Sequence, residues 1–340
     1  MSTVLSVIIV SWNVCDLLQR ALTSVYASWD SQSELEVIVV DNASHDDSVT
    51  MLRADFPNVR VIANTENRGF TGGNNQGLAA ATGDYLLLLN PDTEAVADAL
   101  PRMVDHIRAH PDVGMVGPQL LNPDGSVQSS RRHFPTLPVL LLESTWLEKL
   151  TPRKLLRHYY AQAQPDDAIQ DVDWITGAAM LARREAFMQV GGMDEGFFMY
   201  SEELDWCRRI RDAGWRIVYF PEAQVVHHEG KSSEQVVPAR HMYFQTSKVR
   251  YTRKYHGNAI AEILRIWLLA QYVWQIGIEG AKWLIGHHRD LRAARIAAYR
   301  QVLKSKLRVA SCELRIANYE SANQRIGEAT DHAKPTTQNP

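Results

Sequence analysis

Short apolar runs alternate with amphipathic segments over the first half of the chain. Continuous runs of β-branched and other apolar residues indicate strands buried on both faces, and apolar residues spaced three or four apart indicate helices. The predicted strands lie near 5–12, 35–41, 59–63, 84–90 and 113–118. The predicted helices lie near 16–28, 46–55, 73–81 and 94–109. This alternation is typical of an α/β domain whose mostly parallel, doubly wound sheet is covered by helices on both faces.

The pattern is less regular after this region and then becomes helical. Prolines interrupt residues 120–172, which we expect to form a variable insertion over one edge of the sheet. The elements predicted after it are strands at 174–182 and 215–220 and helices at 184–190 and 201–213. From Pro238 the pattern is nearly continuous helix, and the polar tail from Ser321 is expected to be disordered.

Residues 259–285 form the most apolar part of the helical region. The longest stretch without a formal charge, 266–278, is shorter than the roughly 20 residues that a membrane-spanning helix needs. The helix is therefore predicted to be amphipathic, and its apolar face either packs on the protein or another subunit, or lies in a membrane interface. Tryptophans with basic residues after them suit a lipid headgroup layer. These residues are Trp267, Trp274, Trp283, Lys282, Arg289, Arg292 and Arg295.

Composition narrows the class of protein. The 340 residues are 45% hydrophobic and 22% charged, as in ordinary globular proteins, and the net charge of -3 argues against nucleic-acid binding. The three cysteines are far apart in sequence and lack disulfide or zinc spacing, which favours a reducing cytoplasm. The first residues lack the basic segment of a signal peptide, so none is expected.

Polar residues follow three of the predicted strands. Asn13 comes after the first strand, Asp41 ends the second, and Asp92 follows the apolar run at 85–89. Ligands of open α/β sheets bind beyond the carboxyl ends of the strands. One aspartate there could equally cap a helix beginning near Thr93. Three neighbouring polar strand ends together predict a ligand site.

Residues 67–77 hold four glycines and three asparagines between a predicted strand and a predicted helix. Such a loop lets backbone amides approach a ligand closely, and the following helix N-terminus favours an anionic group. The spacing is neither Gly-x-Gly-x-x-Gly nor a Walker loop, so NAD binding and ATP hydrolysis are poorly supported. A tight turn with a helix cap would have a similar composition.

A cluster of acids opens the predicted helix that begins near Ser201. Ser201 can cap this helix, and acids in its first turn complement the helix dipole. Three acids within four residues exceed what a cap requires, and one of them could act as a general base. These acids are Glu202, Glu203 and Asp205. Asp205 is expected to form an ion pair with Arg208 or Arg209 rather than to act in catalysis.

Two adjacent histidines, His227 and His228, stand after the last predicted strand. A histidine at a strand end is more often a hydrogen-bonded structural residue than a metal ligand. Combined with Asp92, either histidine could complete a mixed carboxylate and imidazole site for Mg²⁺ or Mn²⁺.

Taken together, these segments resemble the inverting family-two glycosyltransferases with the GT-A fold, in the bacterial rhamnosyltransferase-like branch that builds cell-surface polysaccharides. The matching segments cover roughly residues 5–235, in order and at sensible spacing. They are Ser6–Asn13, Val39–Ser44, 67–77, Leu89–Asp92, Trp174–Ala178, Val190–Glu195, the acidic helix, and His227 with Gly230. The resemblance implies an α/β fold of GT-A type, a doubly wound mixed sheet with a C-terminal helical extension.

The resemblance also implies a division of the chain. A catalytic domain would span 1–237, with a donor half at about 1–119 and an acceptor half at about 120–237. A helical extension would span 238–320, and a disordered tail 321–340. We expect a cytoplasmic protein, either free or peripheral on the inner face of the membrane, that can form a homo-oligomer.

Residue roles follow from the same resemblance. Asp41 would recognise the donor base, and Asp92, at the last position of the family's Asp-x-Asp motif, would meet the metal. Glu202-Glu203 stands where the family usually has Glu-Asp, so the base matches Glu203, with Glu202 as the alternative. His227 fits the family's His-x-x-Gly-x-Ser spacing, and His228 remains an alternative.

The full predicted site has four groups of residues. The donor-binding residues are Ser11, Asn13, Asp41, Arg68, Gly69, Gly73, Asn74 and Asn90. The metal-binding residues are Asp92 and His227. The catalytic residues are Glu203 and Glu202, and the acceptor-binding residues are Trp174, Gly177 and Tyr200. Trp206 is a further candidate for a sugar-stacking platform with Trp174 and Tyr200, although at least one of the three is expected to pack in the core.

The implied function is metal-dependent, inverting glycosyl transfer with Mg²⁺ or Mn²⁺ as cofactor. The donor would be dTDP-rhamnose or, second, a UDP-sugar, and the acceptor a saccharide or lipid-linked saccharide. One alternative is a catalytically silent subunit that binds a nucleotide sugar, which would have no reason to keep both Asp92 and the acid pair. Another is a sugar nucleotidyltransferase, which would need a basic glycine-rich loop near the N-terminus, where residues 11–20 offer only Arg20.

Overall fold

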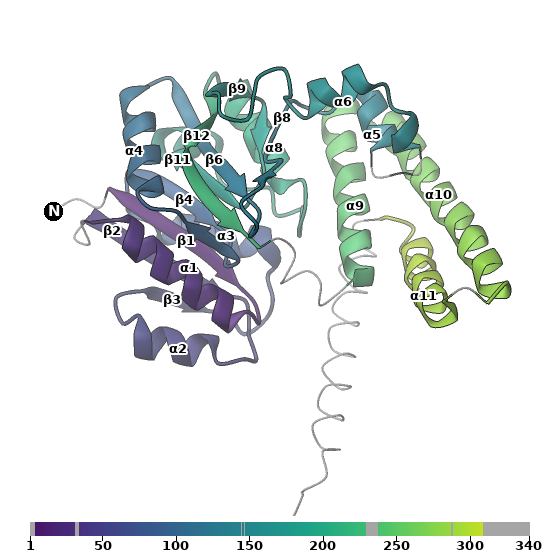
Figure 1. Ribbon diagram of the computed structural model, residues 1–340, viewed down its shortest axis with the longest axis horizontal. Coiled ribbons are helices and arrows are strands. Elements are labelled where there is room, and N and C mark those ends of the chain that lie inside the picture. Colours follow the sequence, from purple (N-terminus) through teal and green to yellow (C-terminus); the bar gives the residue numbers. More distant parts are fainter. Residues whose placement is uncertain are drawn as a thin grey trace, which may run out of the picture. The chain divides into compact units, whose positions relative to one another are not determined.

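A computed structural model describes residues 4–30, 34–143, 145, 147–228, 237–286 and 288–308. The chain divides into two compact units, residues 1–235 and residues 236–340. The first unit is an α/β domain, and the described part of the second unit is helical (Figure 1).

A ten-stranded mixed sheet forms the centre of the first unit. Four neighbouring strands of one half run parallel, as the apolar runs predict. In spatial order they are β3 (Arg60–Ala63), β2 (Leu35–Asp41), β1 (Leu5–Ser11) and β4 (Tyr85–Leu89). In this register the last residue of β1, Ser11, lies opposite the last residue of β2, Asp41.

The other half of the sheet begins with a strand of opposite direction. This strand, β11 (Ala179–Arg183), lies antiparallel between β4 and β6 (Val113–Leu121). The remaining strands of the path are β12 (Arg216–His227), parallel to β6, and β5 (Thr93–Ala95), antiparallel to β12. Shorter strands are β7 (Val127–Gln128) and β9 (Gln170–Val172) on this sheet, and the separate pair β8 (Arg131–Arg132) and β10 (Trp174–Ile175).

Helices cover both faces of the sheet (Figure 1). The helices of the doubly wound part are α1 (Cys15–Ser28), α2 (Ser48–Asp55), α3 (Gly69–Ala80), α4 (Ala99–Ala109), α7 (Arg184–Val190) and α8 (Glu202–Asp212). The insertion adds α5 (Leu137–Leu142), α6 (Arg153–Tyr159) and the 3₁₀ turn η2 (Glu148–Leu150). Side chains alternate along β1, so Leu5, Val7 and Ile9 join a core with α1 and α4.

The glycine-rich segment 67–77 is mostly helix, because α3 begins at Gly69, four residues before the predicted start. A Cβ atom at Gly73 would lie 2.7 Å from Cγ1 of Val10, and one at Gly77 would overlap the side chain of Ile8. These glycines therefore let α3 approach β1 closely, and this packing offsets the low helix propensity of glycine.

Three other boundaries differ from the sequence prediction. No helix begins near Thr93, because residues 93–95 pair with the end of β12, and α4 starts only at Ala99. The strand predicted at 174–182 is divided between β10 and β11. Strand β12 continues to His227, beyond the predicted end at 220, because its second half finds partners in both β6 and β5.

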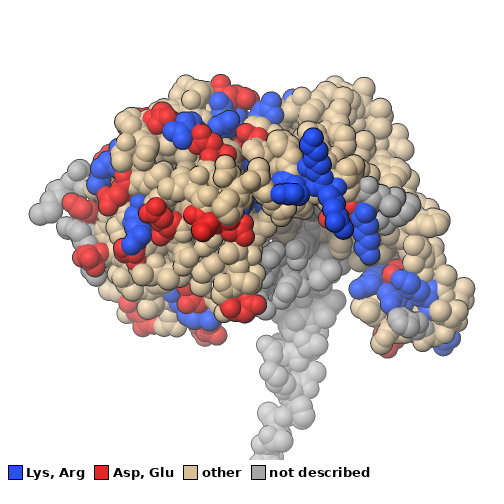
Figure 2. All heavy atoms as spheres, turned by 45° about the horizontal axis from the view of Figure 1, so that its top comes forward, with Lys and Arg blue, Asp and Glu red and all other residues tan. Residues whose placement is uncertain are grey.

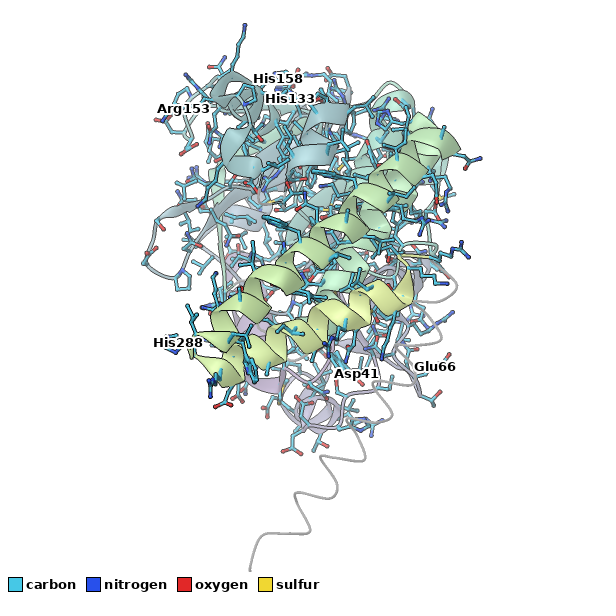
Figure 3. All side chains as sticks on the ribbon, turned by 90° about the vertical axis from the view of Figure 1, so that its right-hand side faces the viewer. Asp41, Glu66, His133, Arg153, His158 and His288 are labelled. Carbon is cyan, nitrogen blue, oxygen red and sulfur yellow. The ribbon has the colours of Figure 1, made fainter. Side chains whose placement is uncertain are left out.

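The second unit contains three described helices. They are α9 (Val237–His256), α10 (Asn258–Leu284) and α11 (Arg289–Ser305). Gly257, with φ of 88°, separates α9 from α10. Helices α10 and α11 lie side by side as an antiparallel pair (Figures 1 and 3). Within the described residues, no helix is both long and apolar enough to cross a membrane, and the predicted tail at 321–340 lies outside them.

Candidate active site

Asp41 places a carboxylate at the end of β2 (labelled in Figure 3). Its side chain is buried, and Oδ2 accepts a hydrogen bond from the backbone N–H of Ser44 at 3.0 Å. The other oxygen, Oδ1, has no hydrogen-bond partner among the described residues, and neither has the buried Oγ of Ser11 on the adjacent strand. A buried polar atom without a partner is unfavourable by about 1–3 kcal/mol, so these two atoms mark a place for a ligand.

Asn13 joins this strand end to the next one. It has a left-handed backbone with φ of 54°, which asparagine tolerates better than most residues. Its backbone N–H donates to Oγ of Ser44 at 3.0 Å, and its Oδ1 accepts from the N–H of His45 at 2.8 Å. The loops after β1 and β2 are thereby tied together, and Asn13 lies beside Asp41 as the strand-end pattern predicts.

A chain of side-chain amides that was not singled out from the sequence holds the start of α3 in place. Asn42 donates to the carbonyl of Gly69 at 2.9 Å, and its Oδ1 accepts from Asn64 at 3.0 Å. Asn64 and Gln76 exchange hydrogen bonds of 2.8 and 2.9 Å. This network fixes the glycine-rich segment against the carboxyl end of β2.

The predicted donor residues of the glycine-rich segment differ in their accessibility. Asn74 is buried, and its amide donates to the carbonyl of Phe70 at 2.9 Å within the helix. Gly69 has φ of 72° and lies against Phe198, where any Cβ would clash. Gly73 packs on β1, whereas Arg68 is exposed just before the helix. Their roles toward a donor remain predictions.

Asp92 and His227 face each other across the edge of the sheet. Asp92 is 5% exposed, and its Oδ1 lies 3.4 Å from Nε2 of His227. His228 points elsewhere, with its Nε2 2.8 Å from Oε1 of Glu94. Of the two histidines left open by the sequence, His227 is therefore the one that accompanies Asp92.

Gln128 sets the proton position on the His227 ring. Nδ1 of His227 lies 2.7 Å from Oε1 of Gln128, whose amide nitrogen donates to Asn122 at 3.1 Å. Because that oxygen accepts, Nδ1 is the donor in this hydrogen bond, and Nε2 is the ring nitrogen that faces Asp92. Nε2 of His227 and Oδ1 of Asp92 lie 3.4 Å apart, close enough for both atoms to bind one cation.

Asp92 and His227 fit a metal ion that is held jointly with a substrate. Among the described residues, no group of three or more His, Cys, Asp or Glu side chains could hold a metal. Mg²⁺ commonly binds proteins through one or two side chains and completes its coordination with substrate phosphates and water. Asn90 lies nearby with a buried Oδ1 that has no partner in the described part of the chain.

The acid pair stands at the first turn of α8. Glu202 is 4% exposed, Glu203 is half-buried, and in each carboxyl group Oε2 is buried with no hydrogen-bond partner among the described residues. Burial raises the pKa of both groups, and the charge of Glu203 raises that of Glu202 further, well above the ordinary range. Arg132 opposes this effect and lowers the pKa of Glu203.

The residues before the acid pair are held in an unusual backbone conformation. Tyr200 and Ser201 have φ of 68° and 65°, although neither is glycine. Ser201 occupies the predicted cap position, but it makes no side-chain cap hydrogen bond. Left-handed backbone at two successive residues stores strain, which is common at functional sites. Gly177 lies against both Glu203 and Phe70, so Gly177 and Tyr200 flank the acids.

Other residues of α8 are structural. Asp205 is fully buried and pairs with Arg209 at 2.9 Å, the second of its two predicted partners. Arg209 also donates to the carbonyls of Val190 and Gly192. Trp206 is fully buried and belongs to the core rather than to a sugar platform, as does most of Trp174, which is 8% exposed.

Residues 6–191 match the family described as Glycosyl transferase family 2. The chain belongs to this family. It is 32% identical over 253 residues to the N-acetylglucosaminyl-diphospho-decaprenol L-rhamnosyltransferase of Mycobacterium tuberculosis, over 71% of this chain and 81% of that protein. It is 29% identical over 184 residues to the rhamnosyltransferase WbbL of Escherichia coli K12, over 50% of this chain and 62% of that one.

Solved structures with a similar fold include two glycosyltransferases. GalNAc-T7 with UDP, GalNAc and Mn²⁺ superimposes with a TM-score of 0.55 at 18% identity, over 74% of this chain and 48% of that one. The mannosyltransferase PcManGT from Pyrobaculum calidifontis with GDP-Man and Mn²⁺ superimposes with a TM-score of 0.53 at 17% identity. This match covers 92% of this chain and 87% of that one. The family 2 glycosyltransferase described here thus has the GT-A fold that its sequence predicts.

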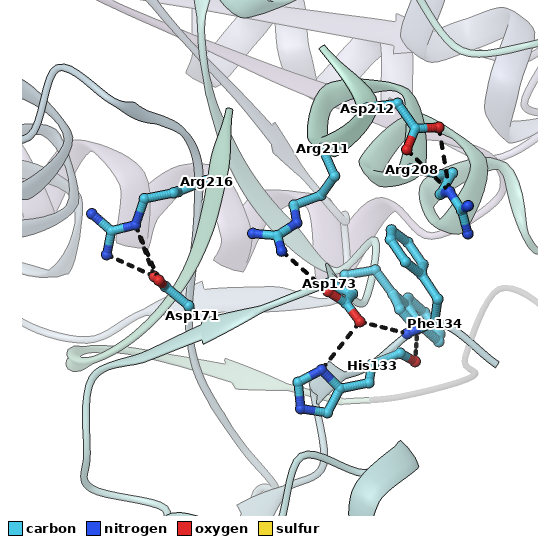
Figure 4. A network of polar contacts seen from close by, with 9 residues as sticks. His133, Phe134, Asp171, Asp173, Arg208, Arg211, Asp212 and Arg216 are labelled. Atoms are coloured by element: carbon cyan, nitrogen blue, oxygen red, sulfur yellow. Dashed lines mark hydrogen bonds and ion pairs between the residues drawn. The ribbon is translucent and has the colours of Figure 1, made fainter. Parts of the chain in front are cut away.

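A polar network in the glycosyltransferase anchors the insertion to the acidic helix (Figure 4). The carboxylate of Asp173 accepts from the backbone N–H of Phe134 at 2.9 Å and lies 3.1 Å from Nδ1 of His133. It also pairs with Arg211 of α8 at 3.4 Å. Arg132 is the last residue of β8 and directly precedes His133, so this network holds that guanidinium on the side of α8.

Arg132 is, like Gln128, a residue of this site that sequence reasoning missed. Its guanidinium lies over the rings of Tyr160 and Trp174, at 5.0 and 5.3 Å from their centres. It is separated from Glu203 by about seventy residues and lies in a segment without regular periodicity, so no local pattern pointed to it.

Proposed function

We propose that this family 2 glycosyltransferase transfers rhamnose, with inversion at the anomeric carbon, from dTDP-rhamnose to a lipid-linked saccharide in cell-surface polysaccharide synthesis. The names of the two rhamnosyltransferases to which the chain is similar support the sugar, and the mycobacterial name supports a saccharide on diphospho-decaprenol as acceptor. A UDP-sugar is the second candidate donor, because uracil and thymine share the imide N–H.

The observation that carries the proposal is the acid pair at the start of α8. Two carboxyl groups with buried, unpartnered oxygens exceed what capping the helix requires. Their unequal surroundings separate their roles, because Glu202 is the more buried and Arg132 favours the ionised form of Glu203. Glu202 therefore holds a proton, and Glu203 is the carboxylate that can accept one from the acceptor.

The transfer step then uses Glu203 as general base. As the acceptor hydroxyl oxygen bonds to the anomeric carbon, its proton passes to Glu203, and the bond from that carbon to the donor diphosphate breaks. Attack from the side opposite to the leaving group inverts the configuration. Tyr200 and Gly177 flank Glu203 and would border the acceptor.

The donor would be held at the ends of three strands. Asp41 has a free acceptor atom, Oδ1, for the imide N–H of the base, and Asn13 fixes the loop beside it. Asp92 and His227 would hold the metal with the donor diphosphate, and Mg²⁺ or Mn²⁺ bound there would neutralise the negative charge of the leaving nucleoside diphosphate. Gln128 would orient the His227 ring for that role, because it holds Nδ1 and leaves Nε2 facing Asp92.

A donor panel tests the function directly. The purified protein is incubated with dTDP-rhamnose, UDP-sugars and GDP-mannose in the presence of Mg²⁺ or Mn²⁺, and release of the nucleoside diphosphate is measured. We expect turnover of dTDP-rhamnose that depends on an added lipid-linked acceptor. Binding of these donors without any turnover would instead identify a silent binding subunit.

Asp41→Ala is expected to weaken binding of dTDP and UDP by roughly ten- to a hundred-fold. The reason is the loss of a charged acceptor from a desolvated hydrogen bond, about 1.5–3 kcal/mol. Isothermal calorimetry measures the change, and dCDP serves as a control ligand because cytosine lacks the imide N–H. Equal affinity for dTDP in the variant and the wild type would exclude this role for Asp41.

Arg132→Gln is expected to move the acidic limb of the profile of kcat/KM against pH to higher pH. Transfer requires ionised Glu203, so activity falls as pH falls through its raised pKa, and removing Arg132 raises that pKa further. Arg132→Lys keeps the charge and should leave the limb near its wild-type position. A limb that stays in place in Arg132→Gln would show that the guanidinium serves packing alone.

A further inference from the structure

The two units of the chain carry opposite net charges. Residues 1–235 contain 19 Lys and Arg against 32 Asp and Glu, a net charge of -13. Residues 236–340 contain 17 Lys and Arg against 7 Asp and Glu, a net charge of +10. The overall value of -3 conceals this asymmetry. Most of the positive charge lies in the described helices, because residues 237–308 contain 14 Lys and Arg against 3 Asp and Glu. This excess indicates an anionic partner for the helices.

Helix α10 presents an uncharged apolar stripe to solvent. Its large members are Ile263, Ile266, Val273, Trp274 and Ile278, and all but the last are more than half exposed. Successive members are three, seven, one and four residues apart, which at 100° per residue places all five within one side of the helix. The other exposed positions from 263 to 281 are alanine or glycine. The stripe is therefore about 27 Å long without a charged side chain in it.

Basic side chains surround the end of this stripe, at the turn between α10 and α11 (Figure 2). Trp283 is exposed there, with the guanidinium of Arg289 5.4 Å from its ring centre. Glu279 is buried and is shared by Arg292 at 2.8 Å, Arg295 at 3.7 Å and Lys282 at 3.8 Å. Three cations on one carboxylate leave an excess of positive charge beside the apolar surface.

We propose that α10 and α11 lie on an anionic lipid bilayer, with the stripe inserted into the interface and the basic side chains among the headgroups. Tryptophan and apolar residues next to cations are typical of helices that lie in a membrane interface. Charge decides against the helical unit of a second copy as the occupant, because two such units would each bring a net charge of +10. An anionic bilayer offers both an apolar interior for the stripe and negative headgroups for the basic side chains. This inference goes beyond the proposed transfer reaction and does not depend on the identity of the sugar.

Co-sedimentation of the full chain with vesicles tests the inference. The vesicles consist of phosphatidylcholine with roughly a third phosphatidylglycerol, compared with phosphatidylcholine alone. We expect binding to the anionic vesicles at low salt and release at high salt, since exposed charges are then screened. The double variant Trp274→Glu with Ile278→Glu should bind at least about tenfold more weakly. The control Met188→Glu changes an exposed apolar residue of α7, 69% exposed, and should bind like the wild type.

Three outcomes would overturn the inference. The wild type could ignore anionic vesicles at every salt concentration, or the double variant could bind as well as the wild type. Sedimentation velocity could also show a dimer that only the double variant abolishes, which would make a second copy the occupant. Thermal unfolding confirms that the variants are folded. Transfer to a water-soluble acceptor analogue should be unchanged in the double variant, whereas failure of the proposed function would remove transfer from the wild type and leave vesicle binding intact.

Discussion

Asp92→Ala is expected to lower kcat/KM for sugar transfer by about 10³-fold or more. Loss of this carboxylate would remove the charged side chain that we propose holds the metal. The stabilisation that a Lewis acid gives a leaving diphosphate is several kcal/mol, and a 10³-fold loss corresponds to roughly 4 kcal/mol. Steady-state kinetics with saturating Mg²⁺ measure the loss. Treatment of the wild type with EDTA should have a comparable effect.

The neighbouring residues provide matched controls for Asp92. Glu94→Gln removes a carboxylate two residues away that pairs with His228 instead of His227, and it should retain most activity. His227→Ala should be impaired more strongly than His228→Ala, because His227 faces Asp92. Wild-type rates in Asp92→Ala, or in the wild type after EDTA treatment, would contradict the assignment of the metal site.

Glu203→Gln is expected to lower kcat by roughly 10²–10⁴-fold, with little change in donor affinity. Glutamine keeps the shape of the side chain but cannot accept the acceptor's proton. Single-turnover transfer measures the chemical step, and calorimetry with dTDP checks the donor site. Glu203→Asp should be partly active. It shortens the reach of the carboxylate by one methylene, but it restores the aspartate that is usual at this position in the family that the sequence resembles.

Glu202→Gln separates the two acids. Because burial and the charge of Glu203 raise the pKa of Glu202 well above its ordinary range, it is expected to be protonated already. An uncharged amide in its place should therefore cost much less activity than the same change at Glu203. If Glu202→Gln is inactive and Glu203→Gln is close to the wild type, the roles of the two acids are reversed.

The sequence predicted strands better than it predicted the start of α3. Apolar runs such as Val37–Val40 are buried on both faces and have few alternatives in an α/β chain. Glycine lowers helix propensity, so the segment 67–77 read as a loop. The contact of Gly73 and Gly77 with β1, visible only in the fold, offsets that preference.

The strand-end residues of the site could be predicted, but their partners could not. Parallel strands end at one edge of the sheet, which is why Asn13 and Asp41 lie together. The choice of His227 over His228 depends on Gln128, 99 residues away in a short strand. Arg132 likewise comes from the irregular insertion, where sequence spacing carries no information about contacts.

The most direct test of the central claim measures two properties of one reaction: the anomeric configuration of its product and its dependence on the carboxylate of Glu203. The wild type and Glu203→Gln are incubated with dTDP-rhamnose, Mg²⁺ and a lipid-linked saccharide, and the product is analysed by nuclear magnetic resonance. The account predicts that the wild type forms a rhamnosylated acceptor with inverted anomeric configuration and that the variant forms almost none. A product with retained configuration, or equal product from both proteins, would contradict it.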